Sequence, residues 1–268
     1  MKPTMLQSPY QKPGERLEAL GLGELVILQD PTSFRFSIDA VLLAWFAADK
    51  INRKTRLIDL GAGTGILSLL LYGRKSVERI KAIELQPKMA NMARRSVLTN
   101  KLEDHIEIIC GDLRNPNTYF HSSSYDAIVC NPPYMPVERG MVNPKDTLAL
   151  SRHEITCTLD DVVRFSKKTL KDHGRIFLVH RADRIADITV SLRNEGLEPK
   201  RILPVHPYRG KPANLILVEA MKKGRPQCKM ESPIFVYDDD GKYTDTINAI
   251  YNKSNQPKMS QSNSKDKT

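Results

Sequence analysis

Short apolar runs alternate along this chain with longer amphipathic stretches. Seven of the apolar runs have the length of buried strands, namely 56–60, 79–84, 106–110, 126–130, 175–179, 199–203 and 215–219. Strands that alternate with helical segments are typical of a mainly parallel sheet with helices on both faces. The pattern therefore predicts an α/β protein with a doubly wound, mainly parallel, seven-stranded sheet.

Helical spacing of apolar residues predicts the segments between these strands. Apolar positions recur at helical spacing around Met89–Val97 and from Leu159 to Leu170. The second helix begins near Thr158, with Asp161 placed as in a capping box, and is expected to end at Gly174. An earlier helix over 38–48 is apolar on most sides and is expected to pack against the sheet.

The chain divides into four expected segments. Residues 1–33 form an N-terminal extension, 34–225 the main domain, and 226–251 a small appendage with a strand, a turn at Asp238–Gly241 and a short helix. The aspartates of that turn lack the spacing and the distal glutamate of a calcium loop, so we expect a surface turn. Residues 252–268 are rich in Ser, Asn, Gln and Lys, and a disordered tail is expected there.

Charge is the unusual feature of the composition. The 268 residues carry a net charge of +10, which favours a polyanionic partner such as nucleic acid, although a solvated lysine-rich surface gives the same value. The four cysteines are widely separated, so neither a zinc site nor a redox dithiol is indicated. The N-terminus lacks the apolar core of a signal peptide, and no run is long enough to span a membrane. We expect a cytoplasmic protein without a bound metal, and the sequence leaves its oligomeric state open.

A glycine-rich turn follows the first strand of the expected sheet. The run Leu57-Ile-Asp-Leu-Gly-Ala-Gly-Thr-Gly65 leads from a buried strand into a helix. Its glycines Gly61, Gly63 and Gly65 permit positive φ and let a ligand approach the backbone. Their GxGxG spacing differs from the GxGxxG of dinucleotide-binding folds.

Acidic residues end three successive strands. Asp59 lies within the glycine run, Glu84 ends the second strand, and Asp112 follows the third with Leu113 beside it. Each acid alone could be a solvated loop residue or a helix cap. Ligands of open α/β sheets bind at the carboxyl ends of strands, so three acids there favour a nucleotide-like ligand. Glu84 could accept hydrogen bonds from ribose hydroxyls, and Asp112 from an adenine amino group.

This arrangement resembles the class I S-adenosylmethionine-dependent methyltransferases, which have a Rossmann-like fold. The resemblance implies S-adenosylmethionine as cofactor, with its ribose at Glu84, its adenine at Asp112 and Leu113, and its methionine part near Asp59 and the three glycines. By the same resemblance, Arg35 or Asp39 could contact the methionine carboxylate. Asp39 could equally be a helix cap.

The motif Asn131-Pro-Pro-Tyr134 follows the fourth strand directly. Two prolines can simply end a strand, but the set looks like the NPPY motif of methyltransferases that modify planar amino groups. Asn131 and the Pro132 carbonyl could each accept one N–H of an exocyclic amine and aim its lone pair at the methyl group. Pro133 would stiffen the loop, and Tyr134 would stack on the acceptor ring, a contact worth about 1–3 kcal/mol per base. Asn131, Pro132 and Tyr134 are thus the expected catalytic residues, and Asn131 would also face the cofactor.

Several features beyond this motif resemble the bacterial tRNA adenine-N6 methyltransferases that act beside the valine anticodon. They include the segment 34–48, the residues Arg152 and His153, and the segment 206–222, which contains Arg209 and Lys211. A basic stretch after the core suits a phosphate backbone, although an ordinary solvated face would give the same pattern; its residues are Lys200, Arg201, Arg209, Lys211, Lys222, Lys223 and Arg225. The resemblance implies tRNA as partner, with Pro133, Tyr134, Arg152, His153, Arg209 and Lys211 as substrate contacts; Arg152 and His153 could also lie on the surface at a helix start.

Two other functions stay open. NPPY motifs also occur in enzymes that methylate a glutamine amide of release factors, although those usually carry a helical N-terminal domain. A non-catalytic RNA-binding protein with a methyltransferase-like fold is the second alternative.

Overall fold

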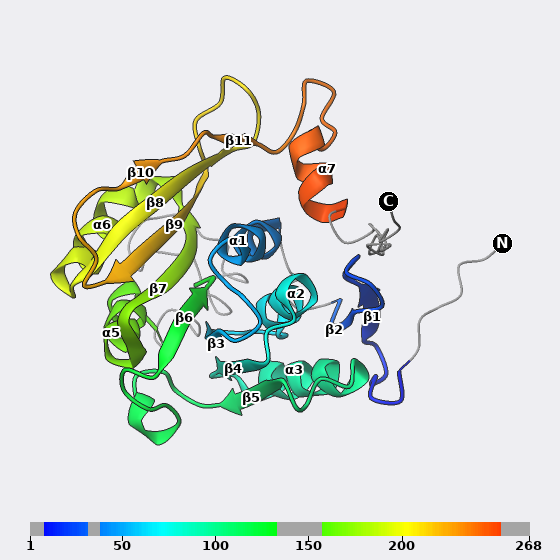
Figure 1. Ribbon diagram of the computed structural model, residues 1–268. Helices are drawn as coiled ribbons and strands as arrows, with labels where there is room; N and C mark the ends of the chain where they lie inside the picture. Colours follow the sequence, from blue (N-terminus) through cyan, green and yellow to red (C-terminus); the bar gives the residue numbers. More distant parts are fainter. Residues whose placement is uncertain (1–7, 32–37, 133–156, 253–268) are drawn as a thin grey trace, which may run out of the picture.

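The computed structural model describes residues 8–31, 38–132 and 157–252 (Figure 1). Its centre is a nine-stranded sheet in the order β10-β8-β9-β7-β6-β3-β4-β5, and β11 also pairs with β8. Seven of these strands are those expected from the sequence: β3 (Arg56–Leu60), β4 (Arg79–Glu84), β5 (Ile106–Cys110), β6 (Tyr125–Cys130), β7 (Leu170–Arg181), β8 (Leu197–His206) and β9 (Leu215–Lys222). The other two strands are short: β11 (Ile234–Phe235) is the strand expected in the appendage, and β10 (Lys229–Met230) was not expected.

Strand direction creates one edge at which most strands end. β3, β4, β5, β6 and β7 pair in parallel, whereas β9 is antiparallel to both β7 and β8. β8 therefore runs in the same direction as β7. The carboxyl ends of β3 to β8 meet at one side of the sheet, called here the carboxyl edge.

Helices cover both faces of the sheet (Figure 1). One face carries α1 (Ile38–Ala48), α2 (Ile66–Lys75) and α3 (Pro87–Thr99), and the other carries α5 (Leu159–Thr169) and α6 (Ile185–Asn194). Leu57 and Ile58 are both fully buried but belong to different apolar clusters, because successive side chains of a strand point to opposite faces. The predicted doubly wound α/β fold is confirmed, and α1 spans the residues expected for it.

The helix expected to end at Gly174 is shorter than predicted. Its capping box is present, since Thr158 accepts a hydrogen bond from the Asp161 backbone N–H and Asp161 accepts one from the Thr158 N–H. The helix ends at Thr169, and Leu170 is already extended and pairs with Tyr125. The residues between Leu170 and Arg175 form an irregularity at the start of β7, with His173 at φ 63°. Strand pairing with β6 therefore ends the helix before the glycine signal.

The expected N-terminal extension contains a two-stranded hairpin. β1 (Arg16–Ala19) and β2 (Val26–Gln29) pair antiparallel and lie beside α3 (Figure 1). Two short 3-10 helices lie in connections of the sheet, η1 (Pro116–Thr118) after β5 and η2 (Ala182–Arg184) after β7.

The segment 226–251 attaches to the far edge of the sheet. β10 (Lys229–Met230) and β11 (Ile234–Phe235) both pair in parallel with β8, and α7 (Asp245–Asn252) packs on α1. The turn before α7 is the expected surface turn, since the Asp238 carboxylate accepts the N–H groups of Asp240 and Lys242. Of the expected tail, Asn252 belongs to α7, and 253–268 lie outside the described residues. In the described parts of the chain, no helix is long and apolar enough to cross a membrane.

Candidate cofactor and acceptor site

Strand register brings the predicted site residues to the same level of the carboxyl edge. Leu60 pairs with Ile83 on one side and with Cys130 on the other. The glycine turn after Leu60 therefore begins between Glu84 and Asn131. Neighbouring strands lie about 4.8 Å apart, so these residues border one small space.

The three glycines of the turn are required by its backbone conformation. Gly61, Gly63 and Gly65 have φ of 67°, 56° and 86°, a region that residues with a side chain rarely adopt. A Cβ on Gly61 or Gly63 would meet no atom within 4 Å, so both glycines face open space. A Cβ on Gly65 would lie 3.4 Å from the Ala93 Cβ, so this glycine also lets α2 begin close to α3. The turn is thus a cradle whose open side is bare backbone.

Glu84 holds the glycine turn through both carboxylate oxygens. Its Oε2 accepts a hydrogen bond from the Gly63 N–H at 2.9 Å, and its Oε1 accepts one from the Gln86 N–H at 2.8 Å. The residue is 7 % exposed. Each carboxylate oxygen can accept more than one hydrogen bond, so capacity remains for two ribose hydroxyls.

Asp59 is buried beneath the turn. Its Oδ2 accepts hydrogen bonds from the backbone N–H and the hydroxyl of Ser68, at 3.0 and 2.7 Å, in the first turn of α2. Its Oδ1 is buried and has no hydrogen-bond partner in the described chain. Burial raises the pKa of Asp59 to about 7, against the lowering effect of the Ser68 hydrogen bonds and with a further rise from Glu84. A buried carboxylate oxygen of this kind suits a cationic ligand group.

Asp112 follows β5 at the outer end of the site. Arg114 donates hydrogen bonds to both carboxylate oxygens, and this pairing lowers the Asp112 pKa. The ring of Tyr119 lies against Gly111, where a Cβ would come within 2.6 Å of it. Leu113 packs on the apolar cluster of the α5 face. Contacts of Asp112 and Leu113 with an adenine ring stay predictions.

Asp39 is the second residue of α1 and is 9 % exposed. It therefore lies within the first turn of this helix and not at the capping position before it, which was the alternative to cofactor binding. Its contact with the methionine carboxylate stays a prediction, and Arg35 lies outside the described residues.

The predicted acceptor residues are described only in part. Asn131 follows β6 directly and is partly buried, and Pro132 is buried. Pro133, Tyr134, Arg152 and His153 lie outside the described residues. The register of β3 and β6 places the start of the motif beside the glycine turn, as the predicted mechanism requires.

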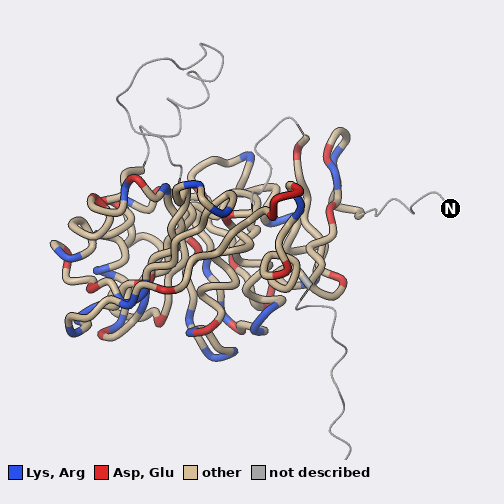
Figure 2. Tube along the Cα trace, turned by 90° about the horizontal axis from the view of Figure 1, so that it is seen from above, with Lys and Arg blue, Asp and Glu red and all other residues tan. Residues whose placement is uncertain are grey.

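The basic stretch after the core does not form one surface. Arg209 and Lys211 are exposed in the connection between β8 and β9, at the carboxyl edge. Lys222 ends β9 at the opposite edge and donates to the Leu170 carbonyl, and Lys223, which follows it, donates to Asp172. In Figure 2 the Lys and Arg positions are scattered over the trace and interspersed with Asp and Glu. Antiparallel pairing of β8 and β9 separates charges that are close in sequence.

Arg201, a residue of this basic stretch, is held by contacts inside the fold. Its guanidinium pairs with Glu219, which is fully buried and also pairs with Arg175. It lies 4.3 Å from the centre of the Phe46 ring and donates to the Phe46 carbonyl at 3.2 Å. Arg201 is therefore part of the packing between α1 and the sheet and is not available to a polyanion.

Three residues of the site were not expected from the sequence. Ser68 binds Asp59, and Thr64 lies buried in the glycine turn, where it accepts a hydrogen bond from Gln29 of β2. Ser68 lies in the first turn of α2, just after the glycine turn, and this position could have suggested its contact with Asp59. Gln29 is far away in the sequence and carries no comparable signal. Among the described residues, no group of three or more His, Cys, Asp or Glu side chains is placed to hold a metal ion.

Comparison with known proteins agrees with this geometry. The family model described as "Methyltransferase small domain" matches residues 38–191, more than half of the chain. A protein from Aliivibrio fischeri named tRNA1(Val) (adenine(37)-N6)-methyltransferase is 32 % identical over 213 residues, covering 79 % of this chain and 86 % of that protein. A protein of the same name from Porphyromonas gingivalis is 28 % identical, covering 71 % and 76 %.

Solved structures support the fold. A structure described as a predicted O-methyltransferase from Agrobacterium tumefaciens has a TM-score of 0.66 at 22 % identity, covering 81 % of this chain and 96 % of that one. TYW2 from P. horikoshii, in complex with MeSAdo, has a TM-score of 0.57 at 15 % identity, covering 80 % and 73 %. At these identities the likeness concerns the arrangement of strands and helices.

Proposed function

We propose that this chain, which belongs to the methyltransferase small-domain family, methylates the exocyclic N6 of adenine 37 in tRNA1(Val). One observation carries the proposal: the register of β3 and β6 sets Asn131 beside the glycine turn. A cofactor cradle and an amine-binding motif then share one space. The names of the relatives support the acceptor.

The residues of the turn suit S-adenosylmethionine. Gly61 and Gly63 leave room for the cofactor against the backbone, and Glu84 has acceptor capacity for ribose hydroxyls. The unpartnered oxygen of Asp59 suits the positive charge of the methionine part. When bound, the cofactor supplies a methyl group on a positively charged sulfur.

Asn131 and Pro132 would prepare the acceptor nitrogen. The lone pair of an adenine N6 is delocalised into the ring, which makes this amine a poor nucleophile. The Asn131 side-chain oxygen and the Pro132 carbonyl can each accept one N–H, which draws the nitrogen toward tetrahedral geometry and localises its lone pair on the nitrogen. The localised lone pair would face the methyl group that the bound cofactor supplies, and the proton that the nitrogen loses after transfer would leave to water. Positioning of this kind can supply several kcal/mol of the barrier reduction, with about 7–11 kcal/mol as the upper range.

Two basic residues at the carboxyl edge would help to position the RNA. Arg209 and Lys211 are exposed at the carboxyl edge, the side at which Asn131 lies. Contacts with phosphates would position the tRNA without reading its sequence. An adenine in a loop can be unstacked at a lower cost than one in a helix. Since its substrate is tRNA, we propose that the enzyme acts in the cytoplasm.

The direct test is methyl transfer to unmodified tRNA. The purified full chain is incubated with methyl-labelled S-adenosylmethionine and a transcript of tRNA1(Val), and the digested RNA is analysed by mass spectrometry. We expect N6-methyladenosine in the wild-type transcript and none in a transcript that carries guanosine at position 37. Cofactor binding without transfer to any RNA would favour a binding protein, and transfer to a release factor instead would favour glutamine methylation.

A further inference from the structure

Gln29, the last residue of β2, reaches the glycine turn from outside the main domain. Its side chain is 1 % exposed, and its Nε2 donates a hydrogen bond of 3.1 Å to the Thr64 hydroxyl. The Oε1 of the same amide is buried and has no hydrogen-bond partner in the described chain. We infer that Gln29 is a cofactor-binding residue whose Oε1 accepts a hydrogen bond from the ammonium group of the methionine part. This inference rests on the proposed function.

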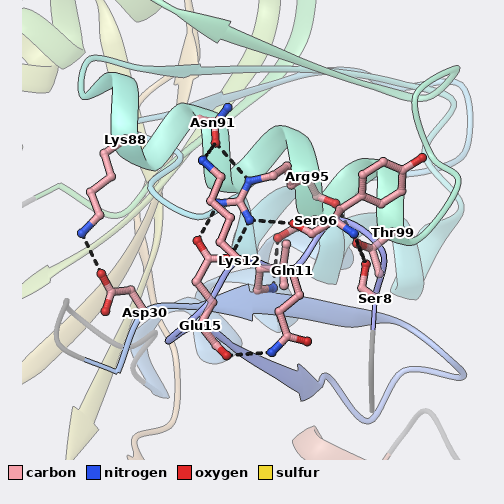
Figure 3. A network of polar contacts seen from close by, with 12 residues as sticks. Ser8, Gln11, Lys12, Glu15, Asp30, Lys88, Asn91, Arg95, Ser96 and Thr99 are labelled. Atoms are coloured by element: carbon pink, nitrogen blue, oxygen red, sulfur yellow. Dashed lines mark hydrogen bonds and ion pairs between the residues drawn. The ribbon is translucent and has the colours of Figure 1, made fainter.

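The hairpin that carries Gln29 is held firmly on α3 (Figure 3). Arg95 of α3 forms a two-pronged ion pair with Glu15, with N–O distances of 2.5 and 2.6 Å, and both side chains are largely buried. The backbone of β2 is bound by the Ser96 hydroxyl at Leu28 and by the Asn100 amide at Val26. Side chains of α3 and of Asn100, which follows it, thus bind the backbone groups along this edge of the hairpin.

This anchoring fixes Gln29 relative to the glycine turn and to the start of α3. Immediately after Gln29, Asp30 forms an ion pair of 2.7 Å with Lys88 at the start of α3 (Figure 3). α3 follows Glu84, and the Thr64 contact ties Gln29 to the glycine turn. The amide is therefore held between the turn and the helix that follows the ribose-binding strand. A side chain held in this way loses little conformational freedom when a ligand binds.

The unpartnered oxygen is the reason to assign a ligand. A buried carbonyl oxygen without a hydrogen bond has lost its water without compensation, and native proteins contain few such atoms. Asp59 Oδ1 is a second buried and unpartnered acceptor below the same turn. The Gln29 Oε1 can only accept, so the group that satisfies it must be a donor, and an ammonium group offers three N–H bonds. The methionine part of the cofactor carries such a group.

The experiment compares two ligands that differ in the amino-acid part. S-adenosylhomocysteine has the ammonium group, whereas methylthioadenosine has the same adenine and ribose without it. In Gln29→Met, which keeps the size of the side chain, we expect the Kd of S-adenosylhomocysteine to rise about tenfold to hundredfold and the Kd of methylthioadenosine to stay unchanged. Both values are measured by calorimetry on the full chain.

Three controls separate this role from a purely structural one. Without ligand, Gln29→Met should unfold within roughly 3 °C of the wild type, because the change removes an unpartnered carbonyl together with one hydrogen bond. Gln11→Met removes an amide that lies just before the hairpin and donates to the Glu15 carbonyl at 2.7 Å, and it should alter neither Kd. Thr64→Val should weaken S-adenosylhomocysteine binding, and Thr64→Ser, which keeps the hydroxyl, should not.

The outcomes are distinguishable. An equal loss of affinity for both ligands would overturn the inference, since Gln29 would then only shape the turn. Unchanged affinity for S-adenosylhomocysteine would overturn it as well. If the wild-type chain bound neither ligand, the proposed function itself would fail, and the inference would fail with it.

Discussion

Glu84 Oε2 accepts a hydrogen bond from the Gly63 N–H at 2.9 Å, so the last residue of β4 supports the glycine turn that follows β3. The same carboxylate accepts the Gln86 N–H through its other oxygen. One buried side chain thus shapes the turn and presents the acceptors that a ribose needs. Changes at Glu84 are expected to act on cofactor binding first.

Glu84→Gln should weaken cofactor binding by about tenfold to hundredfold. An amide has one acceptor oxygen, so one of the two N–H groups that now bind Glu84 would face another donor. We expect a higher Kd for S-adenosylhomocysteine in calorimetry. Glu107→Gln, on the neighbouring strand β5, removes an exposed carboxylate that pairs with Lys81 and should leave this Kd unchanged. Equal affinities of Glu84→Gln and wild type would contradict the assigned ribose contact.

Asp59→Asn should change how stability depends on pH. The ordinary pKa of Asp59 is 3.8, and burial raises it to about 7 in the folded protein. Between these values the folded state keeps a proton that the unfolded state has lost, so this residue lowers the free energy of unfolding as pH rises from about 4 to 7. Asparagine does not titrate, so the variant should gain stability relative to wild type over this range and keep that gain above pH 7. Urea unfolding of the cofactor-free chain from pH 5 to 8 measures the difference; a constant difference would show that the pKa is not raised.

Asn131→Ala should abolish turnover and preserve cofactor affinity. The variant loses the side-chain oxygen that accepts an N–H of the substrate amine, and we expect turnover to fall by at least about a hundredfold. The Kd of S-adenosylhomocysteine and the unfolding temperature serve as controls for the cofactor cradle and the fold. Retained turnover would remove the proposed mechanism for activating the amine.

Substitution of Arg209 and Lys211 by glutamine should weaken tRNA binding. Both residues are exposed at the carboxyl edge, and removing a cation that binds a phosphate reduces the slope of log K against log salt by about 1. We expect a higher KM for tRNA with unchanged KM for S-adenosylmethionine. The control replaces Lys223 and Arg225, which follow β9 at the opposite edge, and carries the same charge change. Equal effects of the two double variants would show that net charge alone attracts the RNA.

The sequence alone predicted the main strands of the sheet and located the glycine turn, whereas the contacts of the site residues with a cofactor stay predictions. Apolar runs identified seven strands and α1, because burial of a strand or helix leaves a periodic pattern in its own residues. The glycine spacing and the acids at strand ends identified the turn, because the carboxyl ends of parallel strands must meet at one edge.

Tertiary structure decided what depends on contacts between distant segments. The end of α5 at Thr169, the separation of Arg209 from Lys223, and the structural environment of Arg201 all follow from strand pairing and packing. Gln29 reaches Thr64 only because the hairpin is anchored on α3. Local patterns record which residues are buried, whereas the partner of a buried polar group is set by the folded arrangement of the whole chain.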